Sequence, residues 1–203
     1  MVWAPAAPEP GLQAARAPGL PIAHSARHLR RVELELASHR QRRASVIDGQ
    51  AAAVVAALAE ACRELEFEPA RRQIDRLIGW GEGLTPAGDD FLVGLLAGLD
   101  ASVEGDSRRP GFRAALAAAI VTALPRTTDI AAHCLRLACG GHYSQALLRL
   151  RQAVLDDAEG LSLDAALQRA LAIGATSGAD GVSGLLAGLR AWSMPAPSTT
   201  MAV

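Results

Sequence analysis

The sequence predicts an all-α fold, organised as a single compact domain of about eight helices. Half of its 203 residues are hydrophobic but only 3% are aromatic, so the core has to be built from Ala, Leu and Val, and Ala and Leu favour helices over sheets. Apolar residues also recur at helical spacing between capping residues, prolines and glycines. Because a chain of this length suits one well-filled core, we expect one domain.

The two ends of the chain differ from its middle. Residues 1–21 are rich in Pro, Ala and Gly and have no periodicity, which predicts a flexible arm, and residues 194–203 are typical of a frayed tail. The predicted helical domain is residues 22–193. Within it, residues 29–36 fit either a helix or an alternating strand, so one short N-terminal strand stays open.

Helix signals then repeat along the domain. Asp48 can cap a helix whose apolar face runs through residues 54–65, and Pro69 can open the next one. Proline or glycine ends most of the later segments, as Pro125 ends the first of them. Apart from two helices described below, these later helices are predicted at residues 110–124, 128–139, 144–155 and 162–173.

An internal repeat of one loop and one helix is the most informative feature. The segment at residues 85–99, TPAGDDFLVGLLAGL, is similar to the segment at residues 176–189, TSGADGVSGLLAGL. The hexapeptide GLLAGL is identical in both copies and starts four residues after an Asp in each. Each glycine costs about 1 kcal/mol relative to Ala inside a helix. Two glycines four residues apart share one face, which predicts close helix contact. If the copies pack on each other, their loops come together.

Both loops lead into a helix N-terminus, where free N–H groups and the positive end of the helix dipole suit an anion. The ligand-binding candidates in the loops are Gly83, Leu84, Thr85, Gly88, Thr176, Ser177, Gly178 and Asp180. Arg126, just ahead of Thr127 and Thr128, can supply a cation for a carboxylate or phosphate, and these three complete the ligand-binding set. An ordinary surface arginine is the alternative for Arg126.

Asp89 and Asp90 are the candidate catalytic residues. Carboxylates at a helix start fit three roles, which are helix caps, oxygen ligands of a hard cation, or a general base. Two adjacent carboxylates exceed what one cap needs, so all three roles stay open. No cofactor is predicted, but a metal-dependent alternative would gather Mg²⁺ or Mn²⁺ among Asp89, Asp90, Asp129 and Asp180.

A cluster of His133, Cys134, Cys139 and His142 superficially suggests zinc. Adjacent side chains on a helix point about 100° apart, so four such residues do not easily meet one ion. We therefore predict no metal there and expect the two cysteines to fill the core.

Charge and composition argue against several function classes. A net charge of −1 gives no reason to expect nucleic acid or an anionic membrane as a partner. All 20 basic side chains are Arg, which excludes lysine Schiff-base and P-loop chemistry. Three cysteines favour a reducing compartment, and the longest apolar run, residues 114–124, is too short to span a bilayer. We expect a cytoplasmic protein without a signal peptide.

Residues 81–92, GEGLTPAGDDFL, resemble the hallmark GxGLTP(S/A)GDDFL of a bacterial family whose best-understood branch is the AllH-type subunit of oxamate carbamoyltransferase. Two further ordered blocks, residues 127–130 and 174–180, support the resemblance, which covers residues 70–192. Trp80 and Glu82 stand where the family has an apolar residue and a Pro, so the entry to the loop differs.

The resemblance implies participation, with partner subunits, in the phosphorolysis of oxalurate to oxamate and carbamoyl phosphate during purine or allantoin breakdown. All four reactants and products are anions, which agrees with loops that receive a small anionic substrate. Whether this chain is itself catalytic stays open. The alternatives are a metal-dependent enzyme and a non-catalytic assembly protein whose glycine-rich helices dock another subunit or a second copy in a homo-oligomer.

Overall fold

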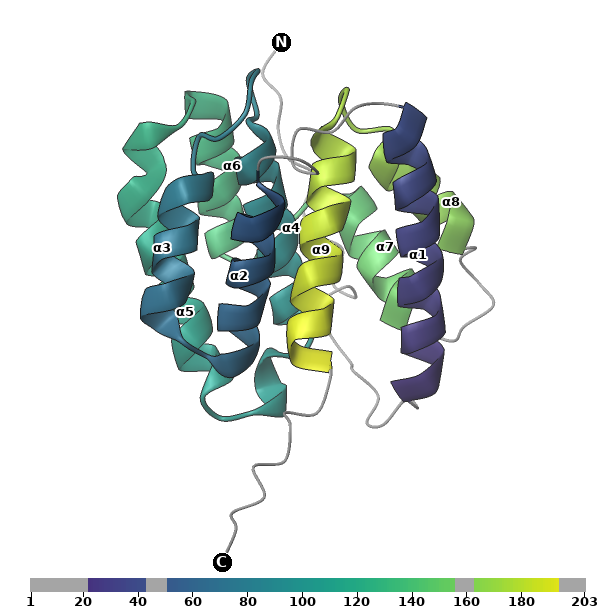
Figure 1. Ribbon diagram of the computed structural model, residues 1–203, viewed down its shortest axis with the longest axis horizontal. Coiled ribbons are helices and arrows are strands. Elements are labelled where there is room, and N and C mark those ends of the chain that lie inside the picture. Colours follow the sequence, from purple (N-terminus) through teal and green to yellow (C-terminus); the bar gives the residue numbers. More distant parts are fainter. Residues whose placement is uncertain (1–21, 43–50, 156–162, 194–203) are drawn as a thin grey trace, which may run out of the picture.

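The computed structural model describes residues 22–42, 51–155 and 163–193, which form helices and the turns between them (Figure 1). The helices are α1 (Ile22–Arg42), α2 (Ala52–Glu64), α3 (Phe67–Leu77), α4 (Ala87–Asp100), η2 (Val103–Gly105), α5 (Arg109–Ala123), η3 (Leu124–Arg126), α6 (Asp129–Cys139), α7 (Gln145–Leu155), α8 (Leu163–Leu171) and α9 (Ser177–Ser193). None of the described residues lies in a strand. The all-α prediction is confirmed, and residues 29–36 belong to α1, which adds a ninth α-helix to the eight expected.

Local signals set several helix ends as predicted. Thr128 accepts a hydrogen bond from an amide of the first turn and so caps α6. Pro110 lies in the first turn of α5, where its missing N–H costs nothing. The predicted Asp48 cap lies outside the described residues, as do the arm 1–21 and the tail 194–203.

The two copies of the repeat, α4 and α9, pack directly on each other at the centre of the molecule (Figure 1). A Cβ atom on Gly94 would lie 1.9 Å from the carbonyl oxygen of Gly181, and one on Gly184 would lie 1.9 Å from that of Phe91. No side chain fits at such distances, so both positions require glycine. The predicted close crossing of the two helices is confirmed.

The same contact is nearly symmetric over a further turn of both helices. A Cβ atom on Gly98 would lie 2.9 Å from the Cα atom of Gly188, and the reverse distance is also 2.9 Å. The two helices are therefore related by an approximate twofold axis. Because these glycines are covered by a helix of the same chain, they do not offer a docking surface for another subunit, which corrects that part of the assembly interpretation.

Two groups of helices lie on either side of this central pair (Figure 1). Each group forms a hydrophobic cluster. One contains residues of α2, α3, α5 and α6 together with most large apolar residues of α4. The other contains residues of α1, α7 and α8 together with those of α9. Each buried Leu or Phe contributes about 1.5–3 kcal/mol. Each copy of the repeat thus supplies the inner wall of one cluster, and the glycine faces join the clusters.

The end of α9 crosses to the opposite cluster. Trp192 packs among the residues of the α2 side, and its indole N–H donates to the carbonyl oxygen of Cys62 at 2.8 Å. Burial raises the pKa of the Cys62 thiol to about 12, so that thiol is unreactive. Cys134 and Cys139 are only partly buried, and all three cysteines are free thiols.

None of the helices in the described ranges combines the length and the apolar character that a membrane span requires.

Candidate functional site

The loop that precedes α4 meets the first residue of α9 in space. The hydroxyl oxygens of Thr85 and Ser177 lie 2.9 Å apart and share a hydrogen bond, although 92 positions separate them in the sequence. The glycine contact between the helices holds their N-terminal ends side by side, so this meeting follows from the packing. Two of the predicted ligand-binding residues, one from each copy, are thereby brought together.

Asp89 braces the first loop from inside. It is only 1% exposed, and its two oxygens accept hydrogen bonds from the amide of Gly79 at 3.0 Å and from the hydroxyl of Thr127. Burial raises the pKa of this carboxyl above its usual value, while the bonds from Thr127 and Gly79 lower it. Asp89 therefore ties the turn after α3 to the start of α6, and both of its oxygens are occupied.

Asp90 has a different environment. Burial raises the pKa of its carboxyl to about 6, the neighbouring hydroxyls of Ser177 and Thr85 lower the pKa, and the charges of Asp180 and Asp89 raise it further. The residue as a whole is half-buried, but its Oδ2 atom is buried without a hydrogen-bond partner among the described residues. Asp90 is thus the carboxylate at the junction of the two loops that retains an acceptor position.

Asp180, the counterpart of Asp90 in the second copy, is fully buried. Its Oδ1 atom lies 3.8 Å from Nη2 of Arg40, which reaches over from α1 and also donates to Ser183. The acid of the second copy, Asp180, therefore lies near a cation, whereas the acid of the first copy, Asp90, lies near two hydroxyls. Asp180 is predicted to bind ligand, and its place beneath the second loop keeps it from the surface.

The carboxylates do not assemble into a metal site. The described ranges contain no group of three or more His, Cys, Asp or Glu side chains placed to hold a metal ion. Asp89, Asp90, Asp129 and Asp180 are accordingly not gathered around one point, and neither are the histidines and cysteines of α6 and the turn after it.

The three residues before α6 connect that helix to the first loop. Arg126 donates to the backbone carbonyl of Asp75 at 2.5 Å and pairs with its carboxylate at 3.5 Å. Thr127 donates to Asp89, and Thr128 donates to the carbonyl oxygen of Leu84. All three side chains thus bond to groups of the protein itself, and the half-exposed Arg126 contacts the end of α3.

Part of the expected anion receptor is already occupied. The amide of Gly88 donates to Trp80, those of Asp89 and Asp90 both donate to Pro86, and that of Gly178 donates to Ile173. A Cβ atom on Gly88 would lie 2.1 Å from the carbonyl oxygen of Leu77, so this glycine serves helix packing. The expectation that the helix-start amides are free is wrong at these positions, because the loops fold back and bond them.

The tip of the first loop is open. A Cβ atom on Gly83 would meet nothing within 4 Å, and Leu84 is 69% exposed. The chain reaches this tip through Gly79 and Gly81, which both have positive φ angles, and a Cβ atom on Gly79 would lie 2.4 Å from the carbonyl oxygen of Arg126. The glycines thus allow a tight turn against the residues before α6.

Sequence reasoning missed Gly79, Asp75 and Arg40 as parts of this arrangement. Gly79 precedes the motif by only two residues, and an isolated glycine after a helix is a signal that could have identified it. Asp75 and Arg40 act through contacts with Arg126 and Asp180, 51 and 140 positions away along the chain. No local pattern reveals contacts of that separation.

Comparisons with known proteins bear on this site. No curated protein matches the chain, and no solved structure matches it. A family model described as "Oxamate carbamoyltransferase subunit AllH" matches residues 77–189, which is more than half of the chain and includes both repeat loops and the residues before α6. The chain therefore belongs to the family of the oxamate carbamoyltransferase subunit AllH.

Proposed function

We propose that the chain is a subunit of an oxamate-type carbamoyltransferase and that it holds the carbamoyl end of a small anionic ligand between its two repeat loops. The reaction would be the phosphorolysis of oxalurate to oxamate and carbamoyl phosphate in purine or allantoin breakdown. The observation that carries the proposal is the hydrogen bond between Thr85 and Ser177 beside Asp90, inside the region that matches the family.

The polar groups at this junction are complementary to a carbamoyl group. Its N–H groups need an acceptor, and Asp90 Oδ2 is one without a partner among the described residues. Its carbonyl oxygen needs donors, and the hydroxyls of Thr85 and Ser177 can turn from each other toward it. Negative charge develops on that oxygen during acyl transfer, so the same two donors would stabilise the transition state.

Arg126 is the cation for the carboxylate or phosphate end of the ligand. Its pairing with Asp75 is half-exposed, and exposed ion pairs are worth about 0–1 kcal/mol. Replacement of Asp75 by a ligand anion as the partner of Arg126 therefore costs little free energy. Asp89 acts as a positioning residue, because it fixes Thr127 and Gly79 on either side of the loop.

Other subunits of the complex would cover the tip of the first loop. Leu84 is 69% exposed and Ile130 47% exposed, and the bond from Thr128 to the carbonyl oxygen of Leu84 keeps the two residues in one region of the surface. Apolar side chains of this size gain about 1.5–3 kcal/mol each when they are removed from water. A partner subunit seated there would also shield the junction from solvent.

The test is an activity assay of the complex purified with its partner subunits. Asp90→Asn and Thr85→Val should each lower the rate of carbamoyl phosphate formation from oxalurate and phosphate by about 100-fold or more, as loss of one transition-state donor does. Asp129→Asn is the control, because Asp129 is an exposed acid in the first turn of α6, outside the junction. An Asp90→Asn complex that forms normally and turns over at the wild-type rate would exclude the proposed role of the junction.

A further inference from the structure

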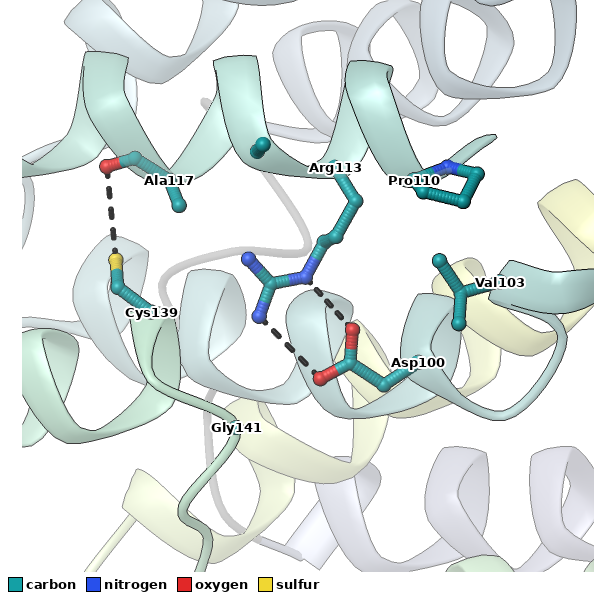
Figure 2. A pocket seen from close by; sticks show the side chains of 8 residues that line it. Asp100, Val103, Pro110, Arg113, Ala117, Cys139 and Gly141 are labelled. Atoms are coloured by element: carbon teal, nitrogen blue, oxygen red, sulfur yellow. Dashed lines mark hydrogen bonds and ion pairs between the residues drawn. The ribbon is translucent and has the colours of Figure 1, made fainter. Parts of the chain in front are cut away.

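A second feature lies at the opposite end of α4 from the loops. An open hollow of about 450 Å³ is bounded by the end of α4, the first turns of α5 and the turn after α6 (Figure 2). Its walls are mostly apolar and include Val103, Pro110, Ala114 and Ala117. Nothing in the proposed carbamoyltransferase chemistry uses this place.

The hollow contains one buried cation, Arg113, whose side chain is only 9% exposed. Its Nε and Nη2 atoms donate to the two oxygens of Asp100 at 2.7 and 3.3 Å, and Nη2 also donates to the carbonyl oxygen of Ala138 at 2.9 Å. Nη2 further lies 3.2 Å from the hydroxyl of Tyr143, which itself donates to Asp100. Two of the three guanidinium nitrogens are thus fully used.

The third nitrogen, Nη1, has no hydrogen-bond partner among the described residues. Figure 2 shows it turned away from Asp100, toward the side of the hollow where Ala117 and Cys139 lie. The thiol of Cys139 donates to the carbonyl oxygen of Ala117 at 3.7 Å and does not bond to Nη1. Nη1 is not among the side-chain atoms that are buried without a partner, so it reaches the open hollow and is available to an acceptor from outside the chain.

The charges around Nη1 decide what kind of acceptor fits. Asp100 already neutralises Arg113, and its bidentate contact keeps a carboxylate close to any ligand. The carboxyl ends of α4 and α6 lie at the hollow, and each bears a partial negative charge, of which the amino end of α5 offsets only one. An anion would be repelled by Asp100 and by this excess, whereas a neutral oxygen acceptor would not.

We infer that this hollow binds a small, neutral, mainly apolar molecule through one carbonyl oxygen, which accepts a hydrogen bond from Arg113 Nη1. The apolar part of the ligand lies against Pro110, Ala114 and Ala117. The site is separate from the Thr85–Ser177 junction and does not depend on the proposed transferase function.

Cyclopentanone and cyclopentanecarboxylate are suitable probes, because they share an apolar ring but differ in charge. In a titration followed by protein NMR, cyclopentanone should shift the amide signals of Ala114, Ala117 and Gly141 with a dissociation constant of about 1–10 mM, a reasonable range for so few atoms. The carboxylate should bind at least about tenfold more weakly. Signals of Thr85 and Ser177 should not move, which separates this site from the junction.

Ala117→Leu fills the hollow without removing any member of the Arg113 network, and it should weaken cyclopentanone binding by about tenfold or more. Ala118→Leu is the matched control on the exposed side of the same helix and should leave binding unchanged. Equal binding of both probes, unshifted signals at Ala114 and Gly141, or full binding by Ala117→Leu would each overturn the inference. The outcome is independent of any activity assay, so it does not stand or fall with the transferase proposal.

Discussion

The two copies of the repeat share their packing and differ in their chemistry. In each helix, a Cβ atom on one glycine would lie only 1.9 Å from a backbone oxygen of the other helix, so no side chain fits there. The preceding loops are unequal, since residues 78–86 connect α3 to α4 and only residues 172–176 connect α8 to α9. The longer loop is braced by the buried Asp89 in the first turn of α4, where the second copy has Ala179 in the first turn of α9.

The repeated motif thus has two structural roles, one for its glycines and one for its acidic residues. The glycine face only has to bring the backbones together, and it does so identically from both sides. The acids do different work, because Asp180 is sealed beneath its loop near Arg40 while Asp90 keeps an acceptor at the junction. In the proposed function, the first copy therefore supplies the carboxylate at the junction, and the second supplies the hydroxyl of Ser177.

A side chain added to the shared glycine face of α4 and α9 should cost the most stability. Gly94→Ala and Gly184→Ala should each destabilise the protein by about 3 kcal/mol or more, and by similar amounts, because overpacking against backbone leaves no room to relax. Urea unfolding measures this. At Gly111 in α5 a Cβ atom would meet nothing within 4 Å, so Gly111→Ala should instead raise the free energy of unfolding by about 1 kcal/mol. Markedly unequal losses at Gly94 and Gly184 would contradict the symmetric contact.

Removal of the brace tests the part that only the first copy has. Asp89→Ala leaves the amide of Gly79 and the hydroxyl of Thr127 without their acceptor, so it should cost about 3 kcal/mol of unfolding free energy. Thermal and urea unfolding are the measurements. Asp129→Ala, at an exposed acid, should change stability by only about 0.5 kcal/mol. A loss as small as that of the control would show that Asp89 does not brace the loop.

The raised pKa of Asp90 gives a pH signature. Its pKa is about 6 in the folded protein against an ordinary 3.8, so the native state binds the proton more tightly than the unfolded state does. The wild type should therefore gain stability relative to Asp90→Asn as the pH falls from 7 to 4, by about 2 kcal/mol. Urea unfolding of both proteins across this range tests it, with Asp129→Asn as the control. A stability difference that does not vary with pH would refute the buried environment assigned to Asp90.

The smallest expected effect concerns the bridge between the copies. Ser177→Ala removes the hydroxyl that bonds Thr85, at a cost of about 1 kcal/mol. It also removes a neighbouring hydroxyl that lowers the pKa of Asp90, so that pKa should rise further. Carboxyl carbon NMR during a pH titration follows this shift. Ser144→Ala at the start of α7 should leave the pKa of Asp90 where it is, and a Ser177→Ala titration identical to the wild type would mean that the second copy does not act on Asp90.

The sequence predicts the fold well because the decisive signals are local or repeated. Composition, capping residues and glycine spacing lead to an all-α fold with a close crossing of two helices, and that crossing brings Thr85 and Ser177 together. Residues 29–36 were ambiguous, because a short apolar pattern fits two periods until its partners α7 and α9 are known.

The details of the site depend on contacts that a local pattern does not contain. The amide of Gly88 bonds Trp80 rather than an external anion, because the loop before α4 folds back on itself. Arg126 faces Asp75 rather than the junction, since the order of α3 and α6 in space decides its neighbours. Whether the candidate residues act on a ligand is the prediction that the assays above address.

The crossing of α4 and α9 also sets the order in which a nascent chain can fold. The helix α4 leaves the ribosome long before α9, and its face without side chains has no other helix to cover it until residues 177–193 are synthesised. Trp192, which joins Cys62 near the end of that stretch, is among the last described residues to emerge. A stalled or truncated chain therefore exposes an unfinished interior, and quality-control proteases would recognise such a fragment readily.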